Sequence, residues 1–217
     1  MKKYLVLILA LVVIACQKEE LTVVQEQEET SFLADRQLVG LIKSVSSHDG
    51  SFDDYVDQSS CFSINFPYTI LLNGEKITIT SINDLLVIKP MDDVVPIFPI
   101  AITTANYMEL AVANQVVFNN YAISCANGLM YDDRITCLDF NYPISLSIYN
   151  LDNTTFETIT YNHDKETFEG LEIFEEGTIA TIKFPVRVKM VDSTTVSIQS
   201  NQQLKSRILQ MLNVCPN

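Results

Sequence analysis

Two stretches of the chain alternate strictly between apolar and polar positions. From Leu138 to Ile148 every second residue is apolar, and the positions between them are polar or proline. The stretch from Ile182 to Met190 alternates in the same way. A period of two with one apolar face is typical of antiparallel strands that bury one face and expose the other to water. The pattern therefore predicts antiparallel sheets in both stretches.

An aromatic residue followed by proline recurs at equivalent points of such stretches. Cys61-Phe-Ser-Ile-Asn-Phe-Pro-Tyr-Thr-Ile70 returns as Cys137-Leu-Asp-Phe-Asn-Tyr-Pro-Ile-Ser-Leu146, and looser copies cover residues 95–102 and 180–188. Proline cannot donate an N–H to a sheet ladder, so it marks a strand start, an edge or a bulge. The copies therefore predict an internal repeat with an equivalent structural role for each proline, and a binding role is the less favoured alternative.

The first predicted module covers residues 58–127. A strand over 61–72 meets Asn73-Gly74, which is a strong hairpin signal, and the chain returns over 75–80. Ser81 begins a capping box for a short helix that Pro90 stops. The strand around Phe98-Pro99 then leads to a longer helix over 105–121. The predicted order of this module is ββαβα.

The second predicted module, residues 135–217, repeats this plan with one strand more. The strand that begins at Cys137 returns over 155–161, and Asn162 can cap a helix over 166–174. Strands over 179–191 and 195–199 follow, and Ser200 caps the last helix. That helix has an apolar stripe of Leu204, Ile208, Met211, Leu212 and Cys215. The fold class that we predict is therefore α+β: two related modules, ββαβα then ββαββα, each an antiparallel sheet with helices on one face.

The N-terminal residues have the features of a targeting segment. Lys2 and Lys3 precede an apolar run over 4–15 that is too short to span a bilayer, and Val13-Ile-Ala-Cys16 resembles the lipobox of bacterial lipoproteins. That resemblance implies a signal peptide of residues 1–15, cleavage before Cys16, and fatty acylation of Cys16, which would hold the chain to the outer membrane. The alternative is an ordinary signal peptide that ends at a chance cysteine.

Residues 16–57 are predicted to form an acidic tether and a short amphipathic helix. Cys16-Gln-Lys-Glu-Glu20 is similar to the surface-export signal of Bacteroidetes lipoproteins, although a solvated tether has the same composition. The helix is predicted from five apolar residues: Phe32, Leu38, Leu41, Ile42 and Val45. We considered calcium at the acidic loop His48-Asp-Gly-Ser-Phe-Asp-Asp54. Its spacing lacks the alternation of an EF-hand loop, so the sequence predicts no metal site.

Four cysteines remain once Cys16 is assigned to the lipid. An even number in an exported chain predicts two disulfides among Cys61, Cys125, Cys137 and Cys215. Strand directions in the second module favour Cys137–Cys215, with Cys61–Cys125 as its counterpart in the first. A Cys125–Cys137 bond is the rival pairing, and free buried thiols are a further alternative.

Composition restricts the classes of function. The chain has 14 basic and 27 acidic residues, a net charge of −13, which argues against nucleic acid as a partner. There is no Trp, and there are only two His and six Gly, so no phosphate loop or histidine metal site is legible and no cofactor is expected. His48 and His163 are expected at the surface. The glutamates of residues 166–176 could serve as paired acids, but the solvated face of a helix is the simpler interpretation.

Three segments together carry a resemblance to a known family. They are His48-Asp-Gly-Ser-Phe-Asp-Asp54, Ser59-Ser-Cys-Phe-Ser-Ile-Asn-Phe-Pro67 and Cys137-Leu-Asp-Phe-Asn-Tyr-Pro-Ile-Ser145. They resemble a family of flavobacterial cell-surface lipoproteins with repeated Cys-x4-[Phe/Tyr]-Pro strand motifs. The resemblance implies display on the outer membrane and implies no activity, cofactor or catalytic residue. Separately, Asp192-Ser-Thr194 resembles the Bacteroidetes O-glycosylation sequon, with Ser193 as the acceptor.

The sequence thus predicts a lipid-anchored cell-surface protein with a non-catalytic role in binding, adhesion or envelope interaction. Its expected partners are the outer membrane, through the lipid, and a protein or glycan ligand. Two alternatives remain open: a structural or accessory lipoprotein that faces the periplasm, and a surface hydrolase. A binding module would have a groove with convergent polar groups, whereas an enzyme would have a deep pocket with paired carboxylates or a partnered histidine.

Overall fold

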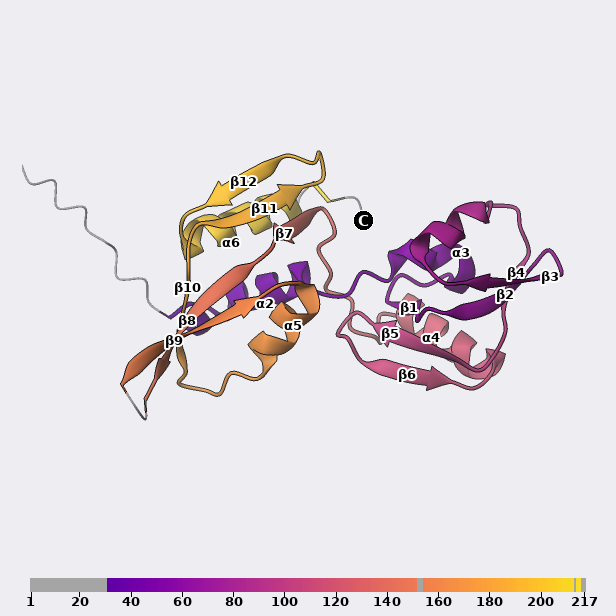
Figure 1. Ribbon diagram of the computed structural model, residues 1–217, viewed down its shortest axis with the longest axis horizontal. Helices are drawn as coiled ribbons and strands as arrows, with labels where there is room; N and C mark the ends of the chain where they lie inside the picture. Colours follow the sequence, from indigo (N-terminus) through magenta and orange to yellow (C-terminus); the bar gives the residue numbers. More distant parts are fainter. Residues whose placement is uncertain (1–30, 152–153, 213, 216–217) are drawn as a thin grey trace, which may run out of the picture.

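The structure is a computed structural model, which describes residues 31–151, 154–212, 214 and 215. These residues form two modules that lie side by side (Figure 1), and each module has a hydrophobic core of its own. All the strand pairs are antiparallel, and helices pack against the sheets. The predicted α+β class is confirmed.

The first module contains two three-stranded sheets, with strand orders β1-β5-β6 and β3-β2-β4. The strands are β1 (Phe62–Ile64), β2 (Tyr68–Leu72), β3 (Glu75–Ile79), β4 (Val94–Pro96), β5 (Ile100–Thr104) and β6 (Glu109–Val112). The helical segments are the 3₁₀ turns η2 (Ser51–Asp53) and η3 (Ile82–Val87) and the α-helices α3 (Asp54–Asp57) and α4 (Gln115–Ala126).

The second module also contains two three-stranded sheets, with strand orders β7-β11-β12 and β9-β8-β10. The strands are β7 (Leu138–Asn141), β8 (Ile144–Asn150), β9 (Thr155–Tyr161), β10 (Ile179–Ile182), β11 (Val186–Met190) and β12 (Thr195–Ile198). Its helices are η1 (Phe32–Ala34), α2 (Arg36–Val45), α5 (Asp164–Glu172) and α6 (Asn201–Leu212).

The two modules have the same sheet topology. The first strand of the first module pairs with the hairpin β5–β6, and β7 pairs in the same way with the hairpin β11–β12. Conversely, β4 and β10 pair with the hairpins β2–β3 and β8–β9. Each module therefore consists of two copies of one unit, in which a leading strand is followed by a proline, a hairpin and a helix. The leading strand of each copy pairs with the hairpin of the other copy, so the two leading strands are exchanged between the two sheets.

The recurrent prolines lie where the chain changes sheet. Pro67, Pro99, Pro143 and Pro185 all follow a cis peptide bond, and each separates two strands that belong to different sheets. The prediction of an equivalent role for the prolines is confirmed. The prediction of continuous strands over 61–72, from Cys137 to the turn before residue 155, and over 179–191 is wrong, because proline lacks the N–H that would continue one ladder.

The predicted helix over 105–121 is wrong in its first half. Residues Glu109–Val112 form β6, which pairs with β5, and the helix α4 begins only after Asn114. The Asn114 side chain accepts a hydrogen bond from the N–H of Val117 and so caps the helix. The first module is therefore not shortened: it has the same elements as the second.

Most of the predicted turns and helix caps are present in the structure. Asn73 and Gly74 both have positive φ in the turn between β2 and β3, as a two-residue hairpin of this kind requires. Ser81 and Asp84 form the expected capping box. Ser200 Oγ accepts from the N–H of Gln203 and so caps α6 as expected, while the Gln203 side chain accepts from the N–H of Gln199. The predicted cap at Asn162 is wrong, because the His163 ring nitrogen accepts from the N–H of Glu166 and caps α5.

The predicted amphipathic helix belongs to the second module, although it precedes the first in the sequence. Helix α2 buries Leu38, Leu41 and Ile42 in the core of the second module. Lys205 of α6 forms an ion pair of 2.7 Å with Asp35, the N-cap of α2. The chain therefore enters the second module first, crosses to the first module, and returns. Figure 1 shows that the described chain begins at the end of the second module that points away from the first.

The segment over residues 49–59 covers the outer edge of β1 in the first module. Asp53 Oδ2 accepts a hydrogen bond of 2.8 Å from the N–H of Ile64 and so satisfies an edge group of β1. Gly50 lies against the backbone of Phe62, where an added Cβ would come within 2.5 Å of the carbonyl oxygen. Glycine is therefore needed for this close approach.

Two glycine substitutions test this packing. Gly50→Ala should lower the free energy of unfolding of the full-length chain by about 1–3 kcal/mol, because backbone must move to admit the methyl group. Gly40→Ala is the control, since a Cβ there meets nothing within 4 Å in helix α2. It should raise stability by about 0.5–1 kcal/mol. Urea denaturation measures both, and equal effects of the two substitutions would contradict the close approach at Gly50.

Candidate functional site

The four remaining cysteines form one disulfide in each module. Cys61 is bonded to Cys125 and Cys137 to Cys215, with Cα atoms 5.8 Å and 5.4 Å apart. The favoured pairing is confirmed, and the alternatives of Cys125–Cys137 and of free thiols are wrong. Asp132 Oδ2 lies 3.6 Å from Cys61 Sγ, but disulfide sulfurs offer no thiolate to a metal ion. Leu212, which was predicted for the core-facing stripe of α6, is instead exposed.

Of the two other predicted modification sites, Cys16 and Ser193, the structure describes only Ser193. Cys16 and the signal peptide lie outside the described residues. Ser193 is exposed in the tight turn between β11 and β12, where the side chain of Asp192 accepts hydrogen bonds from Thr194. An acceptor for a glycan would be accessible there. No helix among the described residues is both long and apolar enough to cross a bilayer.

Aromatic side chains join the two modules. Phe168 of α5 is buried and lies against Tyr107 and Tyr131, with ring centroids 5.5 Å and 6.0 Å away. The Tyr107 hydroxyl donates to the carbonyl of Ser46, and the Lys43 ammonium lies 4.6 Å from the centroid of the Phe168 ring. The last residues of α2 and the chain that follows it therefore meet both modules at this junction.

A polar cleft of about 250 Å³ opens beside this junction. Among the residues that line it are His48, Asp49, Arg134, Asp139 and Asp164. Arg134 forms ion pairs with Asp49 and Asp132. The Asp164 carboxylate accepts from the Tyr142 hydroxyl at 2.7 Å, and burial is the main cause that raises the pKa of Asp164. The cleft thus combines carboxylates with an arginine that already has partners.

His48 has a partner, but the pair does not form a catalytic dyad. Its Nε2 lies 2.6 Å from Oγ of Ser63, and Ser63 is only 3% exposed within β1. A serine nucleophile must reach its substrate, and this one cannot. Burial lowers the pKa of His48, so the ring is neutral at pH 7, and its backbone N–H donates to Ala105. His48 is half-buried and lines the cleft, so it is less exposed than the sequence predicts, whereas His163 is exposed as expected.

Two buried carboxyl groups lie in the segment that covers β1. Asp53 and Asp57 are 1% and 2% exposed, and burial raises the pKa of both carboxyl groups. The negative charge of Asp53 raises the pKa of Asp57 further. Paired carboxyls are a possible acid and base, but the described residues place these two in the interior rather than at an open substrate site.

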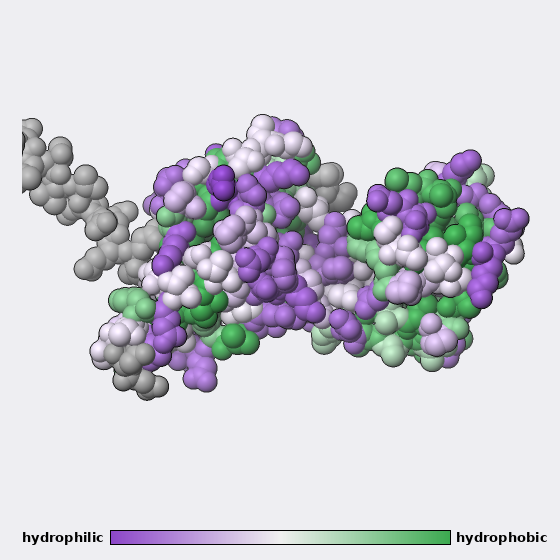
Figure 2. All heavy atoms as spheres, viewed as in Figure 1, coloured by the Kyte–Doolittle hydropathy of each residue, from purple (hydrophilic) through white to green (hydrophobic). Residues whose placement is uncertain are grey.

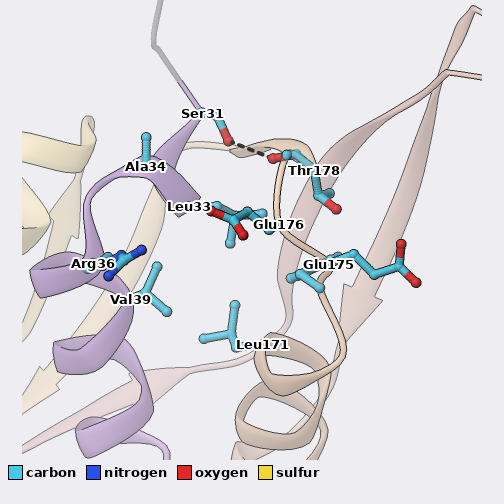
Figure 3. Close-up of a pocket in the computed structure, with 11 residues that line it drawn as sticks. Ser31, Leu33, Ala34, Arg36, Val39, Leu171, Glu175, Glu176 and Thr178 are labelled. Atoms are coloured by element: carbon cyan, nitrogen blue, oxygen red, sulfur yellow. Dashed lines mark hydrogen bonds between the residues drawn. The ribbon is translucent and has the colours of Figure 1, made fainter.

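A larger pocket lies at the start of the described chain. It has a volume of about 610 Å³ between η1, α2 and the end of α5. Figure 3 shows Leu33, Val39 and Leu171 converging on it, and the Ser31 hydroxyl donating to the carbonyl of Thr178. Since Ser31 is the first described residue, this pocket adjoins the point where the predicted tether joins the second module.

A groove on the first module is lined mainly by apolar and amide side chains. It has a volume of about 420 Å³ and lies between α3, β4 and α4. Its apolar lining includes Val56, Val94, Phe118 and Ile123, and its polar lining is mainly the amide side chains Gln58, Gln115 and Asn119. Asp57, which is buried, is the one acidic residue of this lining. Helix α4 has no charged residue, and its Val116 and Ile123 are exposed.

The two modules differ in surface chemistry. Residues 58–127 contain only seven charged residues, whereas residues 135–217 contain sixteen. Figure 2 shows larger hydrophobic areas on the first module than on the second. Exposed aliphatic side chains of the first module include Ile82, Leu86, Met91, Val95, Val116 and Ile123. Contiguous exposed apolar surface is typical of interaction sites, whereas single exposed aliphatic residues are common on any protein.

No family model, curated protein or solved structure matches the chain.

Neither the groove nor the buried carboxyl pair was found from the sequence. The sequence places Asp53 in an acidic loop over residues 48–54, because a run of acidic residues is usually solvated, and it gives Asp57 no role. The lack of charged residues in α4 is the signal in the sequence that points to the groove. The glutamates Glu169, Glu172, Glu175 and Glu176 are exposed, as the simpler interpretation predicted.

The pH dependence of stability tests the buried carboxyl pair. Because the pKa of Asp57 is raised in the folded state above its usual 3.8, the folded state keeps a proton that the unfolded state loses. Stability in metal-free buffer should therefore fall as the pH rises from 5 towards 9, by at most about 1.4 kcal/mol per pH unit for one proton. Asp57→Asn should flatten this slope, since Asn cannot ionise. Urea denaturation at pH 5, 7 and 9 measures it, and parallel curves would contradict the assignment.

Proposed function

We propose that this chain is a lipid-anchored, cell-surface binding protein that docks a partner protein on its first module. One observation carries the proposal. The first module has the larger apolar areas on the face that Figure 2 shows, and its groove is lined by the exposed side chains of Val95 and Ile123 and carries no exposed charge. The predicted anchor precedes the described chain, which begins at the end of the second module that points away from the first (Figure 1). The module that would be presented to a partner is thus the one with the apolar surface.

The polar groups that we described support binding rather than catalysis. Ser63 beside His48 is buried, and the Asp53–Asp57 pair is enclosed. Arg134 of the cleft already has two carboxylate partners. An enzyme of the hydrolase type needs a reactive group that meets its substrate. Among the described residues, the side chains of His48, Asp49 and Asp53 instead attach the segment after α2 to its neighbours, through Ser63, Arg134 and the N–H of Ile64.

The lining of the groove favours a protein segment over a glycan. Aliphatic side chains such as Val94 and Ile123 bury apolar surface, and the amides of Gln115 and Asn119 can hydrogen-bond to a peptide backbone. Pro96 has no N–H, which limits the addition of a partner strand at the edge of β4. Binding would therefore depend on side-chain packing along α4, and the partner segment should be apolar and low in charge.

The lipid anchor can be tested by metabolic labelling. Cells that express the full-length chain are fed an alkyne fatty acid, and the protein should carry the label. Cys16→Ala should abolish the label, because the acylated thiol and its processing site are both lost. Protease treatment of intact cells should then degrade the wild-type protein. Full protection from the protease would place the protein on the periplasmic side and contradict surface display.

The groove can be tested by site-specific photo-crosslinking in intact cells. A benzophenone amino acid replaces Ile123, which is 57% exposed on α4, and should give a discrete cross-linked protein. Val191 is the control position, because it is a similarly exposed aliphatic residue next to β11 of the second module. Identical adducts at both positions, or none at Ile123, would count against the groove. Val116→Glu should weaken the adduct at Ile123 by about tenfold or more, since a charge would be buried at the contact.

A further inference from the structure

Four side-chain oxygens without a hydrogen-bond partner are buried together in the first module. They are Asp53 Oδ1, Asp57 Oδ2, Ser59 Oγ and Tyr68 Oη, and the described residues offer none of them a partner. All four residues are at least nine-tenths buried. Buried polar atoms are nearly always satisfied, so a group of four unpaired oxygens calls for a ligand that is not a protein atom.

Several contacts bring these residues to one place. Asp57 Oδ1 accepts from the N–H of Ser59, which holds the two residues in one tight turn. Asp53 Oδ2 accepts from Ile64, at the end of β1, and Tyr68 begins β2 just beyond Pro67. The rings of Phe52, Phe66 and Tyr68 stack in sequence, with centroids 5.9 Å and 5.6 Å apart. Tyr68 is thus fixed beside the segment that carries Asp53.

The repeated fold does not require this polar cluster. In the second module the residue that follows the corresponding proline, Pro143, is Ile144, and its side chain is buried in the hydrophobic core. Tyr68 takes the equivalent position in the first module. Because the same topology forms with an aliphatic side chain there, the fold does not need the Tyr68 hydroxyl at this position.

We propose that Asp53, Asp57, Ser59 and Tyr68 form a buried binding site for a hard divalent cation of the calcium type. Two carboxylates supply the charge that neutralises such an ion, and two hydroxyl oxygens add further hard donors to a set that contains no nitrogen or sulfur. Water or backbone carbonyls would supply the rest of the roughly six to eight oxygen ligands that calcium takes. The interior position favours calcium over magnesium, because magnesium retains several of its water ligands. The other oxygen of each carboxylate is already held by a backbone N–H.

The cation would stabilise the segment that connects two surfaces of the molecule. Residues 49–59 begin beside the polar cleft, which Asp49 lines, and end at the groove, which Val56, Asp57 and Gln58 line. Binding of the cation would replace protons on the carboxyl groups and fix the wall of the groove. This consequence rests on the proposed function, whereas the cation site itself does not.

Thermal unfolding of the full-length chain tests the site directly. After treatment with EDTA, addition of about 5 mM CaCl₂ should raise the melting temperature by about 5 °C or more, whereas MgCl₂ should have a smaller effect. Asp57→Asn and Asp53→Asn should each abolish most of this shift. Asp54→Asn is the matched control, because Asp54 is exposed in the same segment, and it should keep the full shift.

Tyr68→Phe is a second test for the case in which the aspartate variants do not fold. It keeps the ring and removes only the hydroxyl, so it should fold and bind Ca²⁺ about tenfold more weakly in calorimetric titration. If neither Ca²⁺ nor Mg²⁺ shifts the melting temperature of the wild-type chain, the proposal is wrong and the two carboxyls share a proton instead. An equal calcium shift in Asp57→Asn would also overturn it. Neither result would bear on crosslinking at the groove, so the two proposals fail separately.

Discussion

The architecture depends on one constraint: proline has no N–H to give to a sheet ladder. Each of the four aromatic-proline pairs ends the pairing of one short strand, and the next strand joins the other sheet of the same module. The leading strands are thereby exchanged, so neither half of a module can complete its sheets without the other half. The disulfide Cys61–Cys125 then links the beginning of the first module to helix α4, and Cys137–Cys215 links the beginning of the second module to the chain just after α6.

The exchange of strands creates sheet edges, and the molecule covers them in different ways. In the first module residues 49–59 cover β1, which requires the close approach of Gly50 and the buried carboxylate of Asp53. In the second module Ser31 accepts from Ala180 and donates to Thr178 beside β10. Both covering segments come from the N-terminal part of the chain. That part therefore holds the modules together at Phe168 and also closes their open edges.

The two modules share a topology but have different surfaces. The second module carries most of the charge and receives the chain from the predicted tether, whereas the first is poor in charge and exposes aliphatic side chains around α4. Since topology is the same, the difference lies in the residues placed on it, as is usual when sites are added to a repeated fold. The segment of residues 49–59 contributes lining residues to both the cleft at the junction and the groove on α4.

The sequence alone determined the features that depend on local chemistry. Alternation in residues 138–148, the turn at Asn73-Gly74, the capping residues Ser81 and Ser200, and the repeated prolines predicted antiparallel modules and the disulfide pairing. Tertiary structure alone decided which sheet each strand joins, that α2 packs in the second module, and that residues 109–112 are a strand. It also decided that Asp53 and Asp57 are buried. These outcomes depend on contacts between residues far apart in the chain, and no local pattern of polarity encodes such contacts.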